Sequence, residues 1–183
     1  MQLTARIETR RLILRKPELA DAEDIFANYA ADLEVTRFLT WTPHVSVNES
    51  REVLNARLAH WELGSDFTWC LVPRDGSARI IGMISAAPDE ESPAAKFCLG
   101  CVLGRPWWNG GYMTEALSAV IAMLFAQPQT RCVWAYTDEE NHASMRVLEK
   151  AGMRREVGRQ QSLACPTIGP EPRAAAVFSV ARG

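Results

Sequence analysis

The chain has 183 residues, of which 48% are hydrophobic and 23% are charged, a composition typical of one globular domain with a sizeable core. Its 22 acidic and 20 basic residues are interspersed and give a net charge of −2, which argues against nucleic acid as a partner. No apolar run approaches the ~20 residues of a membrane span, and the first residues lack the apolar core of a secretory leader. We therefore expect a cytoplasmic protein with no membrane partner.

The chain contains five cysteines, an odd number that argues against a disulfide framework and for a reducing compartment. Cys98 and Cys101 stand three residues apart in an expected strand, so their side chains point to opposite faces. This geometry suits neither a disulfide nor a metal, and no second Cys/His pair is suitably placed. The sequence predicts no metal site.

The first elements are predicted from apolar periodicity and from helix boundary signals. Arg10–Lys16 alternates apolar and basic residues and is expected to be a half-buried strand. A short helix follows, with Asp21 as a possible N-cap, and the aromatic stretch Val35–Val45 is expected to be an ordered loop. Ser46 with Glu49 forms a capping-box pattern in front of a longer helix.

The next segments predict a hairpin and a central strand. Gly64 is a suitable residue to end the helix that begins near Ser46. Phe67–Val72 and Ala78–Ala86, separated by a Pro-Arg-Asp-Gly turn, are expected to pair as a β-hairpin. Lys96–Leu103 is apolar on both faces, which is typical of a strand inside a sheet.

The second half alternates strands and helices. A buried helix is expected from Met113 to Phe125 and a buried strand over Arg131–Thr137. A helix ending before Gly152, a strand over 154–160, a proline-rich loop over Ser162–Pro172 and a strand over 174–181 complete the chain. These elements predict a single domain over residues 1–183, of mixed α/β class.

Two glycines, Gly110 and Gly111, stand between the strand Lys96–Leu103 and the helix that follows it. Glycine allows backbone N–H groups to come close to a ligand, and a helix N-terminus adds unpaired donors and the positive end of the helix dipole. The arrangement predicts an anion site, most often for phosphate. The alternative is a glycine turn with no ligand. Neither the P-loop pattern nor the dinucleotide-binding glycine pattern is present.

The stretch Trp-Asn-Gly-Gly-Tyr-Met-Thr-Glu-Ala, residues 108–116, resembles the coenzyme A pyrophosphate loop of the GNAT superfamily of N-acetyltransferases, especially its RimJ/RimL-type branch. "NHASMRVLEKAGM" is similar to a second helix motif of that branch, and the likeness extends from Glu8 to about Arg155. The loop departs from the branch at Asn109 and Gly110, where Gly-Lys is usual, and Arg105 could replace the missing cation.

The resemblance implies one acetyltransferase domain with a mixed, mostly antiparallel sheet of about seven strands and about four helices. It implies that the sheet splays between Lys96–Leu103 and Arg131–Thr137, that acetyl-CoA binds in this opening, and that an amine acceptor attacks its thioester in a ternary complex. The cofactor-binding residues that it implies are Cys101, Val102, Leu103, Asn109, Gly110, Gly111, Tyr112, Met113, Thr114 and Asn141.

The resemblance also implies catalytic roles. Ser144 would donate a hydrogen bond to the thioester sulfur, and the backbone N–H of Val102 would bind the carbonyl oxygen. Many members carry a Tyr as general acid at the position of Leu148. Asn141 and Ser144 could instead serve only as a helix cap and a first-turn serine.

The general base stays open. Five candidates carry suitable side chains: Glu139, Glu140, His142, Glu115 and His44. The "RFLTWTP" segment matches a substrate-side segment of the family, so Trp41, Pro43 and His44 are expected to line an acceptor pocket.

The acceptor would be a protein N-terminus or a small-molecule amine, and dimers occur in the family, so a homodimer through the C-terminal strand is an option. Two other readings remain: a non-catalytic acyl-CoA-binding sensor or partner module of the same fold, and an unrelated α/β domain. Thiol release and coenzyme A binding distinguish the three.

Overall fold

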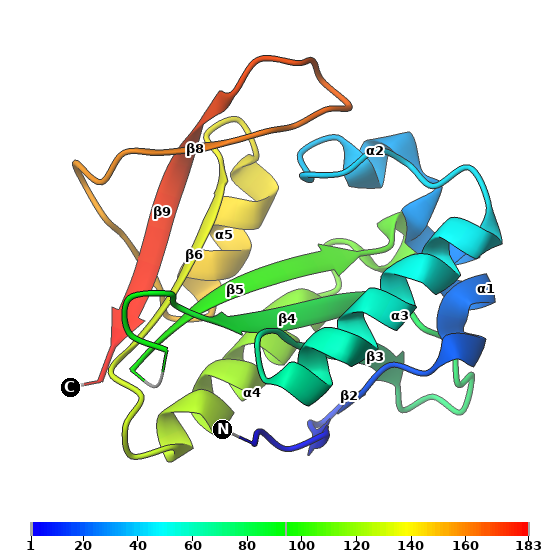
Figure 1. Cartoon of the computed structure of the whole chain (residues 1–183), viewed down its shortest axis with the longest axis horizontal. Coiled ribbons are helices and arrows are strands. Elements are labelled where there is room, and N and C mark those ends of the chain that lie inside the picture. Colours follow the sequence, from blue (N-terminus) through cyan, green and yellow to red (C-terminus); the bar gives the residue numbers. More distant parts are fainter. Residues whose placement is uncertain (1, 94, 183) are drawn as a thin grey trace.

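The computed structural model describes residues 2–93 and 95–182, and these residues form one mixed sheet flanked by helices (Figure 1). The sheet has nine strands in the order β1-β2-β3-β4-β5-β6-β9-β7, with β8 paired to β9. All neighbours are antiparallel except β5 and β6, which are parallel. The strands are β1 Arg6–Glu8, β2 Leu12–Arg15, β3 Phe67–Pro73, β4 Gly82–Pro88, β5 Lys96–Leu103, β6 Cys132–Asp138, β7 Arg154–Arg155, β8 Gln161–Leu163 and β9 Arg173–Ala181.

Helices cover both faces of this sheet, and each face carries its own apolar cluster. On one face α1 and α3 pack on β2, β3 and β4, while on the other α4 and α5 cover a larger cluster that runs from β2 to β9. The helices are α1 Ala22–Ile25, α2 Leu33–Thr36, α3 Val47–Leu63, α4 Tyr112–Ala126 and α5 His142–Lys150; η1 Leu19–Asp21 and η3 Arg105–Trp107 are 3₁₀ turns, and η2 Phe26–Ala30 is a π-helical turn.

The long elements confirm the predictions made from periodicity and capping. The side chain of Ser46 accepts the backbone N–H of Glu49 at the start of α3, and Gly64 ends that helix with a φ of 69°. The strand Lys96–Leu103 is β5, which lies between β4 and β6 inside the sheet. The mixed α/β class and the single splayed sheet are therefore as expected.

The short elements differ from the predictions. Among the described residues the sheet has nine strands rather than seven, because β1 and β8 contain only three residues each and show no readable alternation. There are five α-helices rather than four, because α2 forms at the start of the segment expected to be a loop. The strand expected over 154–160 is confined to Arg154–Arg155, and the second hairpin strand begins at Gly82 rather than at Ala78, which has a φ of 57°.

Candidate active site

The parallel strands β5 and β6 separate along their length. Their pairing covers 96–99 of β5 and 132–135 of β6 and stops at the pair Leu99 and Ala135. On its other edge β5 stays paired with β4 up to Leu103, and β6 stays paired with β9 up to Asp138. The C-terminal halves of β5 and β6 therefore lie on either side of an opening in the sheet, as the sequence predicts.

Hydrogen-bond parity determines which backbone groups face this opening. Gly104 donates to the Ile81 carbonyl at 2.8 Å and Asp89 donates to the Lys96 carbonyl at 2.9 Å, so even-numbered residues of β5 bond to β4. Odd-numbered residues face β6, and the Ala95 carbonyl accordingly accepts from Cys132 at 3.0 Å.

It follows that the backbone N–H groups of Cys101 and Leu103 point into the opening beyond the last β5–β6 pair. The backbone of Val102 points to β4, so its N–H is not available to a carbonyl oxygen in the opening, contrary to the expectation from the resemblance. The Leu103 carbonyl already accepts from the indole N–H of Trp108 at 2.7 Å, which leaves its N–H as the group available for a ligand.

The N-terminus of α4 presents a group of free amides. Gly111 is the N-cap with a φ of 75°, and Asn109 also has a positive φ of 60°. No described residue accepts a hydrogen bond from the backbone N–H groups of residues 109–114. Unpaired amides at a helix start, with the helix dipole behind them, form a site suited to an anion.

A cation lies beside these amides, and it is not the one that the sequence indicates. Arg105 pairs with Asp32 at 3.1 Å. Arg11 instead donates to the Gly110 carbonyl at 2.8 Å and lies 4.4 Å from the ring centre of Tyr112. Sequence reasoning missed Arg11 because it precedes the loop by about a hundred residues, and only the fold brings the two together.

Glu115 anchors this arginine. Its carboxylate accepts from the Nε and the backbone N–H of Arg11, at 2.7 and 2.8 Å, and from the Thr9 hydroxyl at 2.7 Å. Burial would raise the pKa of Glu115, but these hydrogen bonds outweigh it and lower the pKa below 4.5. Glu115 therefore binds β2 and the preceding turn to α4, which removes it from the candidates for a base.

The N-terminus of α5 brings Asn141 and Ser144 to the same opening. The side-chain oxygen of Asn141 caps the helix by accepting the backbone N–H of Ser144 at 3.1 Å, which leaves the amide NH₂ of Asn141 available to a ligand. Leu148, at the position where many family members carry an acid, is 2% exposed and lies in the core.

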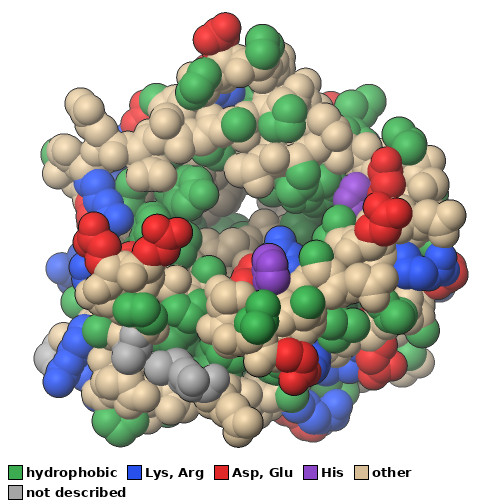
Figure 2. Space-filling view, in the orientation of Figure 1, with side chains coloured by type: hydrophobic (Ala, Val, Ile, Leu, Met, Phe, Trp, Pro, Cys, Tyr) green, Lys and Arg blue, Asp and Glu red, His purple; other side chains and the backbone are tan. Residues whose placement is uncertain are grey.

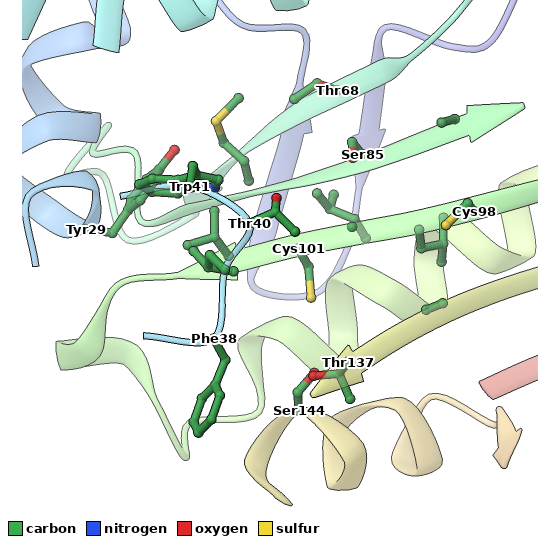
Figure 3. A pocket seen from close by; sticks show the side chains of 18 of the residues that line it. Tyr29, Phe38, Thr40, Trp41, Thr68, Ser85, Cys98, Cys101, Thr137 and Ser144 are labelled. Atoms are coloured by element: carbon green, nitrogen blue, oxygen red, sulfur yellow. The ribbon is translucent and has the colours of Figure 1, made fainter. Parts of the chain in front are cut away.

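A cavity of about 460 Å³ connects these elements, and the space-filling view shows this face hollowed near its centre (Figure 2). The backbone of Cys101 and Val102, the α5 residues Asn141 and Ser144, and Trp41 and His44 all contribute to its lining. Figure 3 shows Tyr29 and Trp41 at one end and Thr137 and Ser144 at the other. Pro43, Leu103 and residues 109–114 are not among the lining residues.

Most candidates for the general base are engaged elsewhere. Glu139 pairs with Arg155 at 2.5 Å and Glu140 with Arg173 at 2.8 Å, while His142 is exposed. None of the three lines the cavity. His44 therefore remains as the candidate for the base that lines the cavity.

His44 is held by its neighbours in a defined orientation. Its Nδ1 lies 2.8 Å from the buried Ser50 hydroxyl, and its ring centre lies 5.0 Å from that of Trp41. Burial lowers the pKa of His44 below 6.5, against an opposing effect of Glu49. When the protonated Nδ1 of the neutral imidazole donates to the Ser50 hydroxyl oxygen, Nε2 is left as the proton acceptor of the ring.

The cavity cysteines are unreactive near neutral pH. Burial raises the pKa of Cys101 to about 11 and that of Cys98 to about 12. Since the thiolate is the nucleophile, these thiols are protonated and inert at pH 7.

All five cysteines are free, and residues 2–93 and 95–182 contain no cluster of three or more His, Cys, Asp or Glu side chains that could hold a metal. None of the described helices is long and apolar enough to cross a bilayer.

Comparison with known proteins identifies the family. The model of the acetyltransferase (GNAT) domain matches residues 11–154. The chain is 28% identical over 149 residues to the uncharacterized N-acetyltransferase p20 of Bacillus licheniformis, covering 81% of this chain and 82% of p20.

Solved structures share the fold. A GNAT-family acetyltransferase from Bacillus anthracis superposes with a TM-score of 0.79 at 22% identity, covering 96% of this chain and 98% of that one. RimL, a ribosomal L7/L12 alpha-N-protein acetyltransferase solved with coenzyme A, gives 0.80 at 15% identity, covering 96% and 97%. The chain therefore belongs to the GNAT family of acetyltransferases, whose acyl donor is acetyl-CoA.

Proposed function

We propose that this chain transfers the acetyl group of acetyl-CoA to a primary amine by direct attack within a ternary complex. The observation that carries the proposal is the free backbone edge of β5, at Cys101 and Leu103, next to the N-terminus of α4. A small-molecule amine or a protein N-terminus is the acceptor; RimL, which shares the fold, is named for a protein acceptor.

The site fits the cofactor along its length. The N–H group of Leu103 matches an extended pantetheine arm that adds to β5 as a strand would, and the N–H group of Cys101 is left for the thioester end of the cofactor. The free amides of 109–114, with Arg11 beside them, suit the diphosphate. The amide NH₂ of Asn141 is available to the pantetheine on the β6 side of the opening.

Each step of the transfer has a residue suited to it. The amine reacts in its neutral form: its nitrogen forms a bond to the thioester carbon, and His44 takes the proton that the nitrogen loses as this bond forms. The Cys101 N–H stabilises the carbonyl oxygen as it gains charge, replacing Val102 in this role. When the C–S bond breaks, coenzyme A leaves with the electron pair, and the Ser144 hydroxyl donates a hydrogen bond to its sulfur. The protonated thiols of Cys98 and Cys101 favour this direct route over an acetyl-cysteine intermediate.

Substitution of Ser144 tests the proposal. In Ser144→Ala we expect kcat to fall about tenfold, the size of one lost hydrogen bond to a charged group, while coenzyme A affinity changes less than about twofold. Thiol release from acetyl-CoA gives kcat and calorimetry gives the affinity.

Ser118→Ala, at an exposed position on α4, is the matched control and should behave like the wild type. Unchanged turnover in Ser144→Ala removes this residue from the mechanism. Tight coenzyme A binding without thiol release for any amine contradicts the transfer itself and leaves a cofactor-binding module.

A further inference from the structure

One wall of the cavity is a row of small residues across three strands. Thr68 of β3 is paired with Ser85 of β4, and Ser85 is paired with Gly100 of β5, so all three lie on one face of the sheet. This is the face of Cys70, Met83 and Val102, the residues packed under α1 and α3. All three residues of the row line the cavity.

Gly100 keeps this wall open. A Cβ built on it would lie 3.1 Å from the Ser85 hydroxyl, closer than an ordinary contact. The strand therefore has no side chain between the Ser85 hydroxyl and the backbone next to the thioester position. A ligand that enters from the α3 side reaches the Cys101 region over Gly100.

Two hydroxyl groups of the lining lack partners. Tyr29 and Thr68 are each only 2% exposed, and no described residue makes a hydrogen bond with either hydroxyl. Leaving a buried hydroxyl unpaired costs about 1–3 kcal/mol, so buried hydroxyls normally have a partner. Both residues line the cavity, and a ligand in it can supply the missing partner.

The charge of the lining favours one class of ligand. None of the described lining residues is an aspartate or glutamate, and those that carry or can carry positive charge are Arg57 and His44. Arg57 pairs with Asp66 and is held by it. A second ammonium group on the ligand would have no carboxylate to bind, and its desolvation would oppose binding.

Aromatic and aliphatic side chains make up most of the remaining acceptor end. Phe38 and Trp41 come from the segment after α2, and Val53 and Leu54 come from α3. Such a surface gains most by covering an apolar or aromatic body.

From these observations we infer that the acceptor is a small primary amine with an apolar or aromatic body that carries a neutral hydroxyl, which pairs with the hydroxyl of Tyr29 or of Thr68. This inference rests on the proposed function and names its substrate class. Polyamines are rejected because the lining lacks carboxylates. A peptide N-terminus is a poorer acceptor because its chain must continue out of the cavity past a largely apolar lining, which leaves its backbone N–H and C=O groups poorly paired.

Four probes of defined chemistry test this inference by thiol release from acetyl-CoA. Tyramine and 2-phenylethylamine differ by one hydroxyl, spermidine carries additional ammonium groups, and a peptide starting with alanine represents protein N-termini. For the wild type we expect kcat/KM for tyramine to exceed that for 2-phenylethylamine by about tenfold, the effect of one satisfied buried hydroxyl, and to exceed the other two further.

The variants Tyr29→Phe and Thr68→Val remove the hydroxyls with little change of shape, and at least one should abolish the preference for tyramine while sparing 2-phenylethylamine. Thr130→Val is the matched control, because Thr130 also carries a buried unpaired hydroxyl but does not line the cavity. It should keep the preference. Since each variant deletes an unpaired hydroxyl, none should lower Tm, and this checks that the variants fold.

The result separates the inference from the proposed function. If spermidine or the peptide is the best acceptor, or if both cavity variants keep the wild-type preference, the inference is wrong while the transfer reaction stands. If no amine releases thiol, the proposed function fails, and tyramine binding to the coenzyme A-loaded protein decides the inference. Tyramine binding that is weakened in Tyr29→Phe or Thr68→Val supports it, and equal binding overturns it.

Discussion

His44 illustrates how burial and one hydrogen bond prepare a side chain for a function. Sequence alone gives it the same standing as four other candidates for a base. The fold distinguishes it, because Nδ1 of its ring lies 2.8 Å from the Ser50 hydroxyl and both residues line the cavity. Its pKa is lowered, so the neutral, proton-accepting form predominates at pH 7.

This predicts the pH dependence of the reaction. The proton-accepting form of His44 is lost as the pH falls through its lowered pKa, so activity should decline below pH 6.5. The amine acceptor has a pKa far above neutrality and must also lose its proton to react, so log kcat/KM should rise with pH with a slope of about two below the pKa of His44 and about one above it, up to the pKa of the amine.

In His44→Gln the slope should be about one throughout, with a lower plateau. His60→Gln, an exposed histidine on α3, serves as the control and should keep the wild-type profile. An acid limb that is identical in His44→Gln and the wild type would assign the proton transfer to another group or to water.

At the residue scale the sequence predicts the groups that carry a local signal. Asn141 is the N-cap of α5 and Ser144 lies in its first turn, and both line the cavity. Arg11 and the unpaired hydroxyls of Tyr29 and Thr68 could not be predicted. Arg11 matters because its partners are distant in the chain, and the two hydroxyls matter because they have no partner among the described residues. Neither property leaves a pattern in the sequence.

The turn from β5 to α4 is the element on which the proposed mode of cofactor binding depends. Gly111 has a φ of 75°, and its Cβ position would lie 3.4 Å from Arg11 Nη2, next to the free amides. A branched side chain there would both strain the backbone and occupy the space that a diphosphate must approach.

We therefore expect Gly111→Val to weaken coenzyme A binding at least about tenfold, which is about 1.4 kcal/mol, by calorimetry. Gly76→Val is the matched control: Gly76 has a φ of 84° in the β3–β4 turn, and nothing lies within 4 Å of its Cβ position. Both variants should lose about 1 kcal/mol or more of stability through backbone strain, but only Gly111→Val should lose affinity. Equal affinities in the two variants would contradict the assignment of the loop.

The elements that the sequence predicts well are those with a local cause. The Ser46 and Gly64 caps bound α3, and alternation marks β2 and β3. The connection between the end of β6 and α5, in contrast, depends on an ion pair between residues that are distant in the sequence. Asp138 is 1% exposed and binds both Arg173 at the start of β9 and the backbone N–H of Glu140.

That pair fixes the geometry of the opening. Burial would raise the pKa of Asp138, but the hydrogen bonds from Arg173 and Glu140 outweigh it and lower the pKa below 3.8. The ionised carboxylate holds β6 against β9 at the level where β6 has separated from β5. The sequence shows an arginine at this position, but it does not show which carboxylate it binds.

Across the whole molecule, two parts of the sheet are joined only by the short parallel ladder between β5 and β6. The β5–β6 ladder has four residue pairs, compared with seven in each of the flanking ladders β4–β5 and β6–β9. In the proposed binding mode the cofactor lies where a longer β5–β6 ladder would run, so it should connect the two parts. At a coenzyme A concentration of 100 Kd, linkage stabilises the folded state by about 2.7 kcal/mol, a rise in Tm of about 5–10 °C for a domain of this size.

Amide hydrogen exchange resolves how the connection is made. Because odd-numbered residues of β5 face the opening, acetyl-CoA should slow exchange at Cys101, through its thioester carbonyl oxygen, and at Leu103, through its pantetheine arm. Val102 already bonds to β4, so its exchange should change little beyond the gain in global stability. Exchange measured residue by residue by NMR, with and without acetyl-CoA, should therefore be slowed at alternate residues along this strand. Uniform protection of the three amides, or protection of Val102 alone, would show that the cofactor does not add to β5 as a strand.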